Sequence, residues 1–338
     1  MSAREISGAD WDAAILEFRD AVHEQTHAYA AARWGARRVR CLVVEREKTI
    51  IGGAAVIEVS VPWLDRGLAV IKFGPLWRSW NGTGGREAAN EVVRSIKAFY
   101  CTQRRLHLSI LPQAPVDDEF LIDGLKAAGF TLGGEIADPA RYLINLTLSE
   151  RDLRDSFAGR ARRNLKSAES RGLTIEEGHG PAARENFMRI FEDLRRRKQQ
   201  VDPSGLEGMW ALDRSVHSSM RPRIFTAKLG DRSLAGIIVT AVGERAYYAF
   251  GAQTEEAAKI SANYYLQWEV VKLLRREGKC RWYDLGGDGN NQGLVQFKTG
   301  LIGKAGRIVT VPARREFSES GISKMMAKGL FRLADVSI

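Results

Sequence analysis

The residue types best suited to chemistry gather near the C-terminal end, in the segment 282–300. Its first residues have the apolar character of a strand and lead into a loop rich in glycine and asparagine, and Lys298 follows on a short predicted helix. Glycine-rich loops expose backbone N–H groups, and a lysine behind such a loop can bind a phosphate or neutralise a developing oxyanion. The alternative is an ordinary strand-to-helix connection with a surface lysine, and the loop by itself leaves both open.

Basic side chains form a second concentration in the segment 151–166. If this segment is helical, its cations cover one broad surface suited to phosphates, formed by Arg160, Arg162, Arg163 and Lys166. A solvated helix without a partner explains the same pattern.

Another basic run, 195–198, ends a predicted helix that begins near Pro181. The helix macrodipole favours cations at a helix C-terminus, so this run needs no functional explanation.

The composition predicts a folded protein that prefers anionic partners. The chain has 338 residues, 44% of them hydrophobic, which is enough for two domains. Lys and Arg number 51 against 41 Asp and Glu, and the formal charge of +10 favours RNA, phosphorylated substrates or an anionic membrane face. A basic surface without a dedicated partner fits the charge equally well.

Targeting and cysteine signals indicate a cytoplasmic protein. No basic and apolar leader begins the chain, and no apolar run reaches the roughly 18 residues that span a bilayer. Cys41, Cys101 and Cys280 lie far apart without a CxxC spacing, so neither a disulfide framework nor a structural zinc site is expected.

The elements that position these residues occur twice in the same order. A helix is predicted over 11–34. The first half then has strands at 38–45, 50–60 and 68–73, a helix at 86–100, a strand at 105–110 and a helix at 118–128. The second half has strands at 223–229, 233–242 and 246–250, a helix at 257–277, a strand at 281–285 and a helix at 292–298. Each half therefore reads β-β-β-α-β-α.

This repeat predicts a duplicated α/β unit with mixed sheets. The order matches the acyl-CoA N-acyltransferase-like (GNAT-like) fold, and that step is an analogy between folds. We expect two tandem GNAT-like domains, 1–147 for the acceptor and 148–315 for the donor and catalysis, with a C-terminal amphipathic helix over 316–338. Ser149 and Asp152 have the spacing of a helix N-cap at the junction.

Several motifs, taken in order, resemble those of the Fem aminoacyltransferases. Tyr283 to Gly287 followed by Phe297 to Gly300 resembles the C-terminal signature of that family. Further similar segments span most of the chain: Gln25-Thr26 with Tyr29 and Arg33, Phe73-Gly74-Pro75, Arg160 to Asn164 with Ala168 and Gly172, Arg197, and Tyr247 to Ala252. One departure is Leu111-Pro112, since many relatives carry an aspartate before that proline.

The resemblance implies an aminoacyltransferase with aminoacyl-tRNA as donor and a nucleotide- or lipid-linked muropeptide, or another small-molecule amine, as acceptor. It implies that Arg33 and Arg197 hold the acceptor diphosphate, with Tyr248 in the same cleft, and that Lys298 stabilises the transition state or the tRNA 3′ end. The basic surface of 160–166 would then contact tRNA. No metal or redox cofactor is implied.

Two other functions stay open. An acyl-CoA-dependent N-acyltransferase acting on an envelope polysaccharide or lipid would have the same fold, although the segment 259–264 lacks the glycine that lets a backbone approach pyrophosphate. A non-catalytic RNA- or membrane-binding protein is the third reading. The tail 321–338 alternates apolar and basic residues and could rest on a bilayer, and packing against the second domain is the expected alternative.

Overall fold

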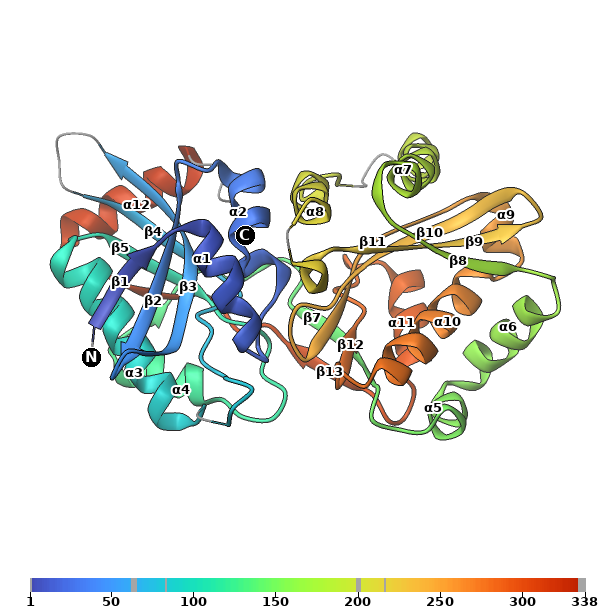
Figure 1. The fold of residues 1–338 in the computed structure, drawn as a ribbon, viewed down its shortest axis with the longest axis horizontal. Coiled ribbons are helices and arrows are strands. Elements are labelled where there is room, and N and C mark those ends of the chain that lie inside the picture. Colours follow the sequence, from blue (N-terminus) through green and yellow to red (C-terminus); the bar gives the residue numbers. More distant parts are fainter. Residues whose placement is uncertain (1, 62–65, 83, 199–201, 216, 334–338) are drawn as a thin grey trace. The chain divides into compact units, whose positions relative to one another are not determined.

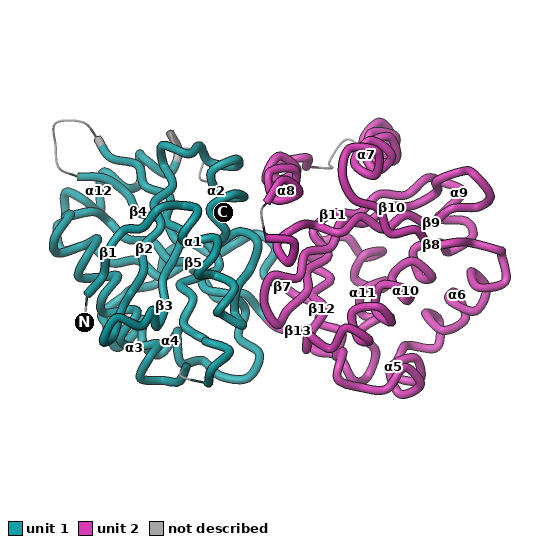
Figure 2. The backbone as a smooth tube through the Cα atoms, viewed as in Figure 1, with its two compact units in different colours: residues 1–139, 310–338 teal, residues 140–309 magenta. Residues whose placement is uncertain are grey.

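The computed structural model describes residues 2–61, 66–82, 84–198, 202–215 and 217–333. The chain forms two compact units, unit 1 with residues 1–139 and 310–338, and unit 2 with residues 140–309 (Figure 2). The sequence predicts a division after residue 147 and a third segment over 316–338. The structure instead begins unit 2 at residue 140 and returns the chain to unit 1 at residue 310.

Unit 1 is built on a seven-stranded mixed sheet. Its strand order is β1 (Ser2–Ile6), β2 (Val39–Arg46), β3 (Thr49–Val61), β4 (Arg66–Lys72), β5 (His107–Leu111), β14 (Arg315–Phe317) and β6 (Thr131–Leu132). Only β4 and β5 pair in parallel among these strands. The predicted meander of three strands and its parallel fourth strand are thus confirmed.

Helices cover both faces of this sheet. The helices of unit 1 are α1 (Gly8–Ala14), α2 (His27–Trp34), α3 (Arg86–Lys97), α4 (Phe120–Ala127) and α12 (Gly321–Leu333). Val56 packs with α3 residues in one core cluster, whereas the next residue, Ile57, packs with α12 residues in another. Successive side chains of a strand point to opposite faces, so α3 and α12 cover opposite faces of the sheet.

The single helix predicted over 11–34 is wrong. The chain forms α1, two short 3₁₀ turns and α2 instead, with extended residues between them. Two carboxylates explain the break. Asp12 accepts hydrogen bonds from the amides of His27 and Ala28 at the start of α2, and Asp20 accepts from the amides of Trp77 and Arg78. Burial raises the pKa of Asp20 to about 7, despite these backbone bonds and the nearby Arg78 cation.

Unit 2 repeats the architecture with another seven-stranded mixed sheet. Its strand order is β13 (Arg307–Thr310), β7 (Ala140–Asn145), β12 (Trp282–Asp284), β11 (Arg245–Gln253), β10 (Arg232–Thr240), β9 (Arg223–Leu229) and β8 (Thr174–Gly178). β11 and β12 pair in parallel, in the same place as β4 and β5 of unit 1. The duplicated mixed α/β fold predicted from the sequence is confirmed.

The helices of unit 2 lie on both faces of its sheet (Figure 1). They are α5 (Glu150–Ser156), α6 (Gly159–Glu169), α7 (Gly180–Arg197), α8 (Leu206–Asp213), α9 (Glu255–Lys259), α10 (Ala262–Glu277) and α11 (Gln292–Ile302). α7 and α8 lie on one face, and α10, α11 and α6 on the other. The helix predicted over 257–277 is interrupted, because Ser261 has a φ of 59° and separates α9 from α10.

One strand of each sheet comes from an unexpected part of the chain. β7 leaves unit 1 and pairs antiparallel with β12, while β14 returns from unit 2 and pairs antiparallel with β5. β14 and β7 therefore fill equivalent positions beside the parallel strands of the two sheets. The β-β-β-α-β-α order is the same in both halves, but the strand beside the parallel pair in each sheet is supplied by exchange.

The C-terminal helix α12 packs on β4 and β5 of unit 1. Ala327 and Leu330 are buried there against Ile57, Leu68 and Val70. The expectation that this helix packs against the second domain is wrong, because β14 brings the chain back to unit 1 before α12 begins. Among the described residues, no helix is long and apolar enough to cross a membrane.

Candidate active site

The parallel strands β11 and β12 separate part-way along their length. They pair at three positions, ending with Tyr247 opposite Asp284, and β11 then continues to Gln253 while the chain after Asp284 turns into the loop 285–291. In unit 1, the corresponding strands β4 and β5 pair up to their last residues, Lys72 and Leu111. The opening between parallel strands is therefore a feature of unit 2.

A cavity of about 690 Å³ occupies this region of unit 2, and we call it the transfer cavity. Its lining comes from the end of α7, from β11, from the start of α10 and from the loop and helix after β12. The lining residues are Leu194, Lys198, Tyr248, Gly251, Ala252, Gln253, Asn263, Asp288, Gly289, Asn291, Leu294 and Lys298. Its size suits a small ligand or the reactive end of a larger one.

Lys298 lies on α11 and is the one buried lysine among the residues that the structure describes, with 5% of its surface exposed. Asn291 caps this helix through a hydrogen bond from the amide of Leu294 to its side chain. The Lys298 ammonium group donates to the carbonyl oxygen of Gly287, in the loop that β12 leads into. The cation predicted to sit behind a glycine-rich loop is thus placed at that loop, and it lines the cavity.

Tyr248 lies opposite on β11, with the Lys298 Nζ atom 5.9 Å from its ring centroid. Burial raises the pKa of Tyr248 to about 12, so its phenol is neutral at physiological pH and can donate a hydrogen bond. The structure brings these two predicted site residues together in one cavity, although they are 50 positions apart in the chain.

The buried carboxylate Asp284 holds the start of the loop. It accepts a hydrogen bond of 2.8 Å from the amide of Gly286, and Arg245 lies 3.7 Å away as an ion pair. Burial raises the pKa of Asp284, while Arg245, Arg141 and Lys298 act to lower it. Gly286 itself has a φ of 74°, so a residue with a side chain would be strained at this turn.

The backbone before α10 is bonded within itself. The amide of Ile260 donates to Glu256, that of Ser261 to Ala258, and that of Tyr264 to Ser261. GNAT-type enzymes bind the pyrophosphate of CoA with unpaired amides at this kind of helix start. Here three of the amides in the segment are already used, and Ala262 is fully buried.

Two other predicted site residues lie outside the lining. Arg197, the last residue of α7, forms an ion pair of 3.1 Å with Asp193 and donates to the carbonyl of Gln253, which does line the cavity. Its neighbour Lys198 takes the lining position. Arg33 belongs to α2 of unit 1, where its guanidinium lies 6.0 Å from the ring of Trp34.

The basic segment forms two helices, α5 and α6, separated at Phe157 and Ala158. Ala161, Leu165 and Ala168 face the core, which leaves the four predicted cations, Arg160, Arg162, Arg163 and Lys166, exposed on α6. Arg160 donates to the side chain of Gln296 on α11, the helix that carries Lys298. A contact between this surface and tRNA stays a prediction.

Sequence reasoning missed two polar residues of the transfer cavity, Asp288 and Asn263. Asp288 is fixed by the hydroxyl of Tyr142, which donates to its Oδ2 atom at 2.7 Å, and by the amide of Asn290 at 2.9 Å. Among the described lining residues it is the one carboxylate. Its position inside the glycine-rich loop was the available signal. Within the described ranges, no group of three or more potential metal ligands occurs.

Residues 155–299 match the family model of the acetyltransferase (GNAT) domain. Unit 2 is therefore an acyltransferase domain. Over the whole chain, the fold is similar to that of FemX, with a TM-score of 0.76 at 18% identity, covering 98% of this chain and 99% of FemX. The protein has a Fem-like tandem GNAT fold.

Two other solved structures are similar to this chain at lower TM-scores. The C-terminal domain of a protein described as a lysylphosphatidylglycerol synthetase from Agrobacterium fabrum gives a TM-score of 0.58 at 13% identity, covering 96% of each chain. L-PGS from Bacillus licheniformis gives 0.53 at 11% identity, covering 97% of this chain and 96% of that one. No curated protein has a significant match to the sequence.

Proposed function

We propose that this acyltransferase moves an amino acid from aminoacyl-tRNA to the amine of a peptidoglycan precursor or of a related small molecule, with the reaction in the transfer cavity of unit 2. The amine nitrogen attacks the ester carbonyl carbon of the donor. An amide bond forms, the bond to the ribose oxygen breaks, and the proton of the amine passes to the leaving hydroxyl group.

The position of Lys298 carries this proposal. Attack on an ester places negative charge on the carbonyl oxygen, and a cation held in a cavity with little water stabilises that charge in the transition state. Lys298 is buried, oriented by Gly287, and next to the neutral phenol of Tyr248. An ammonium and a phenol together supply the donors that an oxyanion needs.

The start of α10 favours an aminoacyl ester over acyl-CoA as donor. A CoA pyrophosphate needs several unpaired amides, but those of Ile260, Ser261 and Tyr264 are bonded internally. An aminoacyl-tRNA does not need this cradle, because its phosphates lie outside the cavity. The exposed cations of α6, Arg160 and Lys166 among them, are the groups that we assign to those phosphates.

We assign the proton transfer to Asp288. Its carboxylate lines the same cavity as Lys298 and is held by Tyr142 and by the amide of Asn290. A carboxylate at this place can accept a proton from the attacking amine and return it to the leaving oxygen. Many Fem enzymes carry an aspartate at the place of Leu111. Leu111 is apolar and buried and cannot transfer a proton, so we assign that role to Asp288.

The acceptor is the second part of the proposal. We assign the diphosphate of a nucleotide- or lipid-linked precursor to Arg197 at the end of α7, as the resemblance to Fem enzymes implies. One protein of similar fold is described as a lysylphosphatidylglycerol synthetase. The product in that name carries an amino acid, which agrees with an aminoacyl donor.

The deciding experiment incubates the protein with a mixture of charged tRNAs and candidate muropeptides or simple amines. We expect the acceptor to gain the mass of one amino acid residue, detected by mass spectrometry. Titration calorimetry with acetyl-CoA is the companion measurement. Tight CoA binding together with no mass gain would overturn the proposal in favour of an acyl-CoA-dependent N-acyltransferase.

A further inference from the structure

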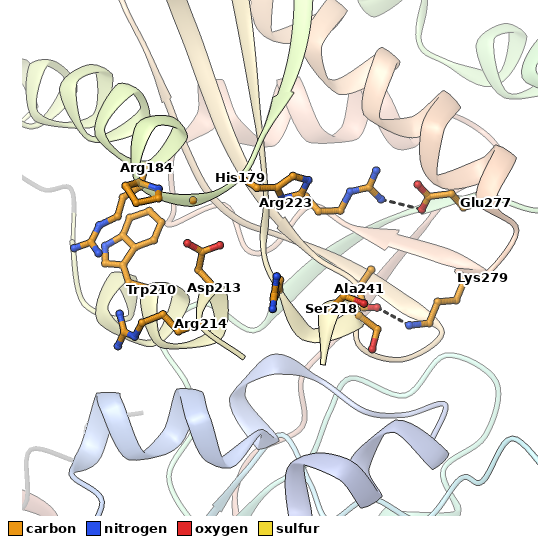
Figure 3. Close-up of a pocket in the computed structure, with 14 residues that line it drawn as sticks. His179, Arg184, Trp210, Asp213, Arg214, Ser218, Arg223, Ala241, Glu277 and Lys279 are labelled. Atoms are coloured by element: carbon orange, nitrogen blue, oxygen red, sulfur yellow. Dashed lines mark hydrogen bonds and ion pairs between the residues drawn. The ribbon is translucent and has the colours of Figure 1, made fainter. Parts of the chain in front are cut away.

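A second and separate pocket of unit 2 has a volume of about 870 Å³ and shares no lining residue with the transfer cavity. It lies between the start of α7, the end of α8, the start of β9 and the end of α10 (Figure 3). We call it the α7–α8 pocket. It is lined by His179, Gly180, Pro181, Arg184, Trp210, Asp213, Arg214, Ser218, Ser219, Arg221, Arg223, Ala241, Glu277 and Lys279.

Positive charge dominates this lining. Five cations, Arg184, Arg214, Arg221, Arg223 and Lys279, stand against two carboxylates, Asp213 and Glu277. They come from α7, the end of α8, the turn before β9, β9 itself and the segment after α10. Cations from elements far apart in the chain therefore line one pocket. A helix with a solvated basic face does not explain this arrangement, because it would account for the cations of that helix only.

Two of these cations build the wall of the pocket. Arg223 binds Glu177 through two nitrogens at 2.7 and 3.0 Å and Glu277 through a third at 2.8 Å. Lys279 donates to the carbonyl oxygens of Ala241 and Val242 at 2.9 and 3.0 Å, and burial lowers its pKa. These bonds, two of them visible in Figure 3, fix the shape of the pocket without a ligand.

The other three cations have no carboxylate partner within the part of the chain that the structure describes. Arg184 lies over Trp210, with its guanidinium carbon 4.8 Å from the ring centroid. Arg221 uses only its Nε atom, which donates to the carbonyl of Ser215 at 2.8 Å. Arg214 follows the last turn of α8. Guanidinium groups with free N–H forks match the oxygens of a phosphate.

The remaining lining also suits a phosphate ester. The hydroxyl groups of Ser218 and Ser219 can donate, and the start of the 18-residue helix α7 carries a partial positive charge. We propose that the α7–α8 pocket binds a compact phosphate ester, of the class of a nucleoside diphosphate, as a second ligand of unit 2. None of the residues that we assign to the transfer reaction lines this pocket, so the site does not depend on that proposal.

Two observations favour a compact ligand over an RNA backbone. Trp210 is only 6% exposed and covered by Arg184, so it offers no stacking platform for an unpaired base. Asp213 lies among the arginines, where it would repel a continuous run of phosphates but can accept hydrogen bonds from ribose hydroxyl or amino groups. The volume also falls within the range of small-molecule sites.

The test is calorimetric titration of the full chain with pyrophosphate, with a nucleoside diphosphate and, separately, with sulfate. We expect both phosphate ligands to bind and sulfate to bind much more weakly. The double variant Arg214→Gln/Arg221→Gln should weaken phosphate binding by roughly tenfold or more, since it removes charge-assisted hydrogen bonds. Arg189→Gln, an exposed α7 arginine outside the pocket that donates to Asn186, is the matched control.

Three outcomes would overturn this site. One is equal binding of sulfate and pyrophosphate, which would mark a general basic surface. The second is binding that the double variant does not change but that Lys298→Met abolishes, which would place the ligand in the transfer cavity. The third is no diphosphate binding alongside tight tRNA binding that the double variant weakens. Thermal unfolding of each variant confirms that folding is retained.

Discussion

The hydroxyl of Tyr248 lies directly over Gly251 on β11, so that a methyl group added at Gly251 would stand 1.7 Å from the Tyr248 oxygen. Glycine at 251 is therefore what allows the tyrosine ring to lie across the strand, inside the transfer cavity and near Lys298. Tyr248 and Gly251 both line that cavity.

Gly251→Ala should displace the Tyr248 ring and lower kcat by roughly ten- to a hundredfold, because a small misplacement of a positioned group has a large effect on rate. Single-turnover transfer measures this. In a Tyr248→Ala background the same change should have little further effect, since both act through one side chain. Gly85→Ala is the control, because a methyl group there meets nothing within 4 Å. Additive losses would contradict the relationship.

Lys298→Met should reduce kcat by roughly a hundred- to a thousandfold with the fold intact, as expected when a donor to a developing oxyanion is removed. Lys304→Met, an exposed lysine after α11, should leave the rate unchanged. The measurement is single-turnover transfer with both variants at matched thermal stability. A Lys298→Met enzyme as fast as the parent would remove this residue from the mechanism.

Asp288→Asn keeps the shape of the side chain but cannot accept a proton, so transfer to an ordinary amine should fall by roughly a hundredfold or more. Hydroxylamine, which is unprotonated at neutral pH, should be affected much less as acceptor. The ratio of the two rates is the readout. An equal loss with both acceptors would show that Asp288 does not take the proton of the attacking amine.

His107 predicts a dependence of stability on pH. This histidine of β5 is buried, and its pKa is lowered to about 4, first by burial and then by Lys324 and Arg314. Glu316 faces it at 3.7 Å, and Phe331 of α12 packs edge-on against its ring. Because the unfolded chain binds a proton at a higher pH than the folded one, stability is complete above about pH 6.5 and falls as pH drops towards 4.

The loss due to His107 should reach at most about 3 kcal/mol at pH 4. It is measured as the difference in free energy of unfolding between the parent and His107→Leu at several pH values, which cancels other groups such as Asp20. A pH-independent difference for His107→Leu would refute the assignment.

α12 should stabilise unit 1 through its buried face alone. Leu330 is 9% exposed and packs against the sheet, whereas Ile322 on the same helix is 60% exposed. Leu330→Ala should lower the free energy of unfolding by about 2–3 kcal/mol, and Ile322→Ala by less than about 0.5 kcal/mol. Chemical denaturation compares the two.

Liposome flotation with and without residues 319–338 tests a membrane contact, and equal recovery would mean that the helix is structural.

Local patterns predicted much of this fold. The order β-β-β-α-β-α follows from strand and helix periodicity, and β9 spans the same residues, 223–229, in the sequence prediction and in the structure. Lys298 behind its glycine-rich loop was also identified from the sequence, because the residues that orient it are its near neighbours in the chain. Such features can be predicted because hydrophobic periodicity and turn residues are properties of short segments of the chain.

Other features depend on contacts between distant residues. The exchange of β7 and β14, the position of α12, and the break of the first predicted helix all arise from pairing and capping across long sequence separations. Asp288 is the clearest case at the site, since its carboxylate is held in the cavity by the hydroxyl of Tyr142, which precedes it by 146 positions.

The sequence by itself determined the elements, their duplication and the lysine that we place at the reacting ester. The tertiary structure decided which strands pair with which, where the parallel strands part, and which polar side chains meet in the resulting cavities. The physical reason is the separation in sequence between the residues that interact. Periodicity and turn chemistry depend on a few neighbouring residues, whereas strand exchange and the burial of a polar group depend on contacts that form only when the whole chain has folded.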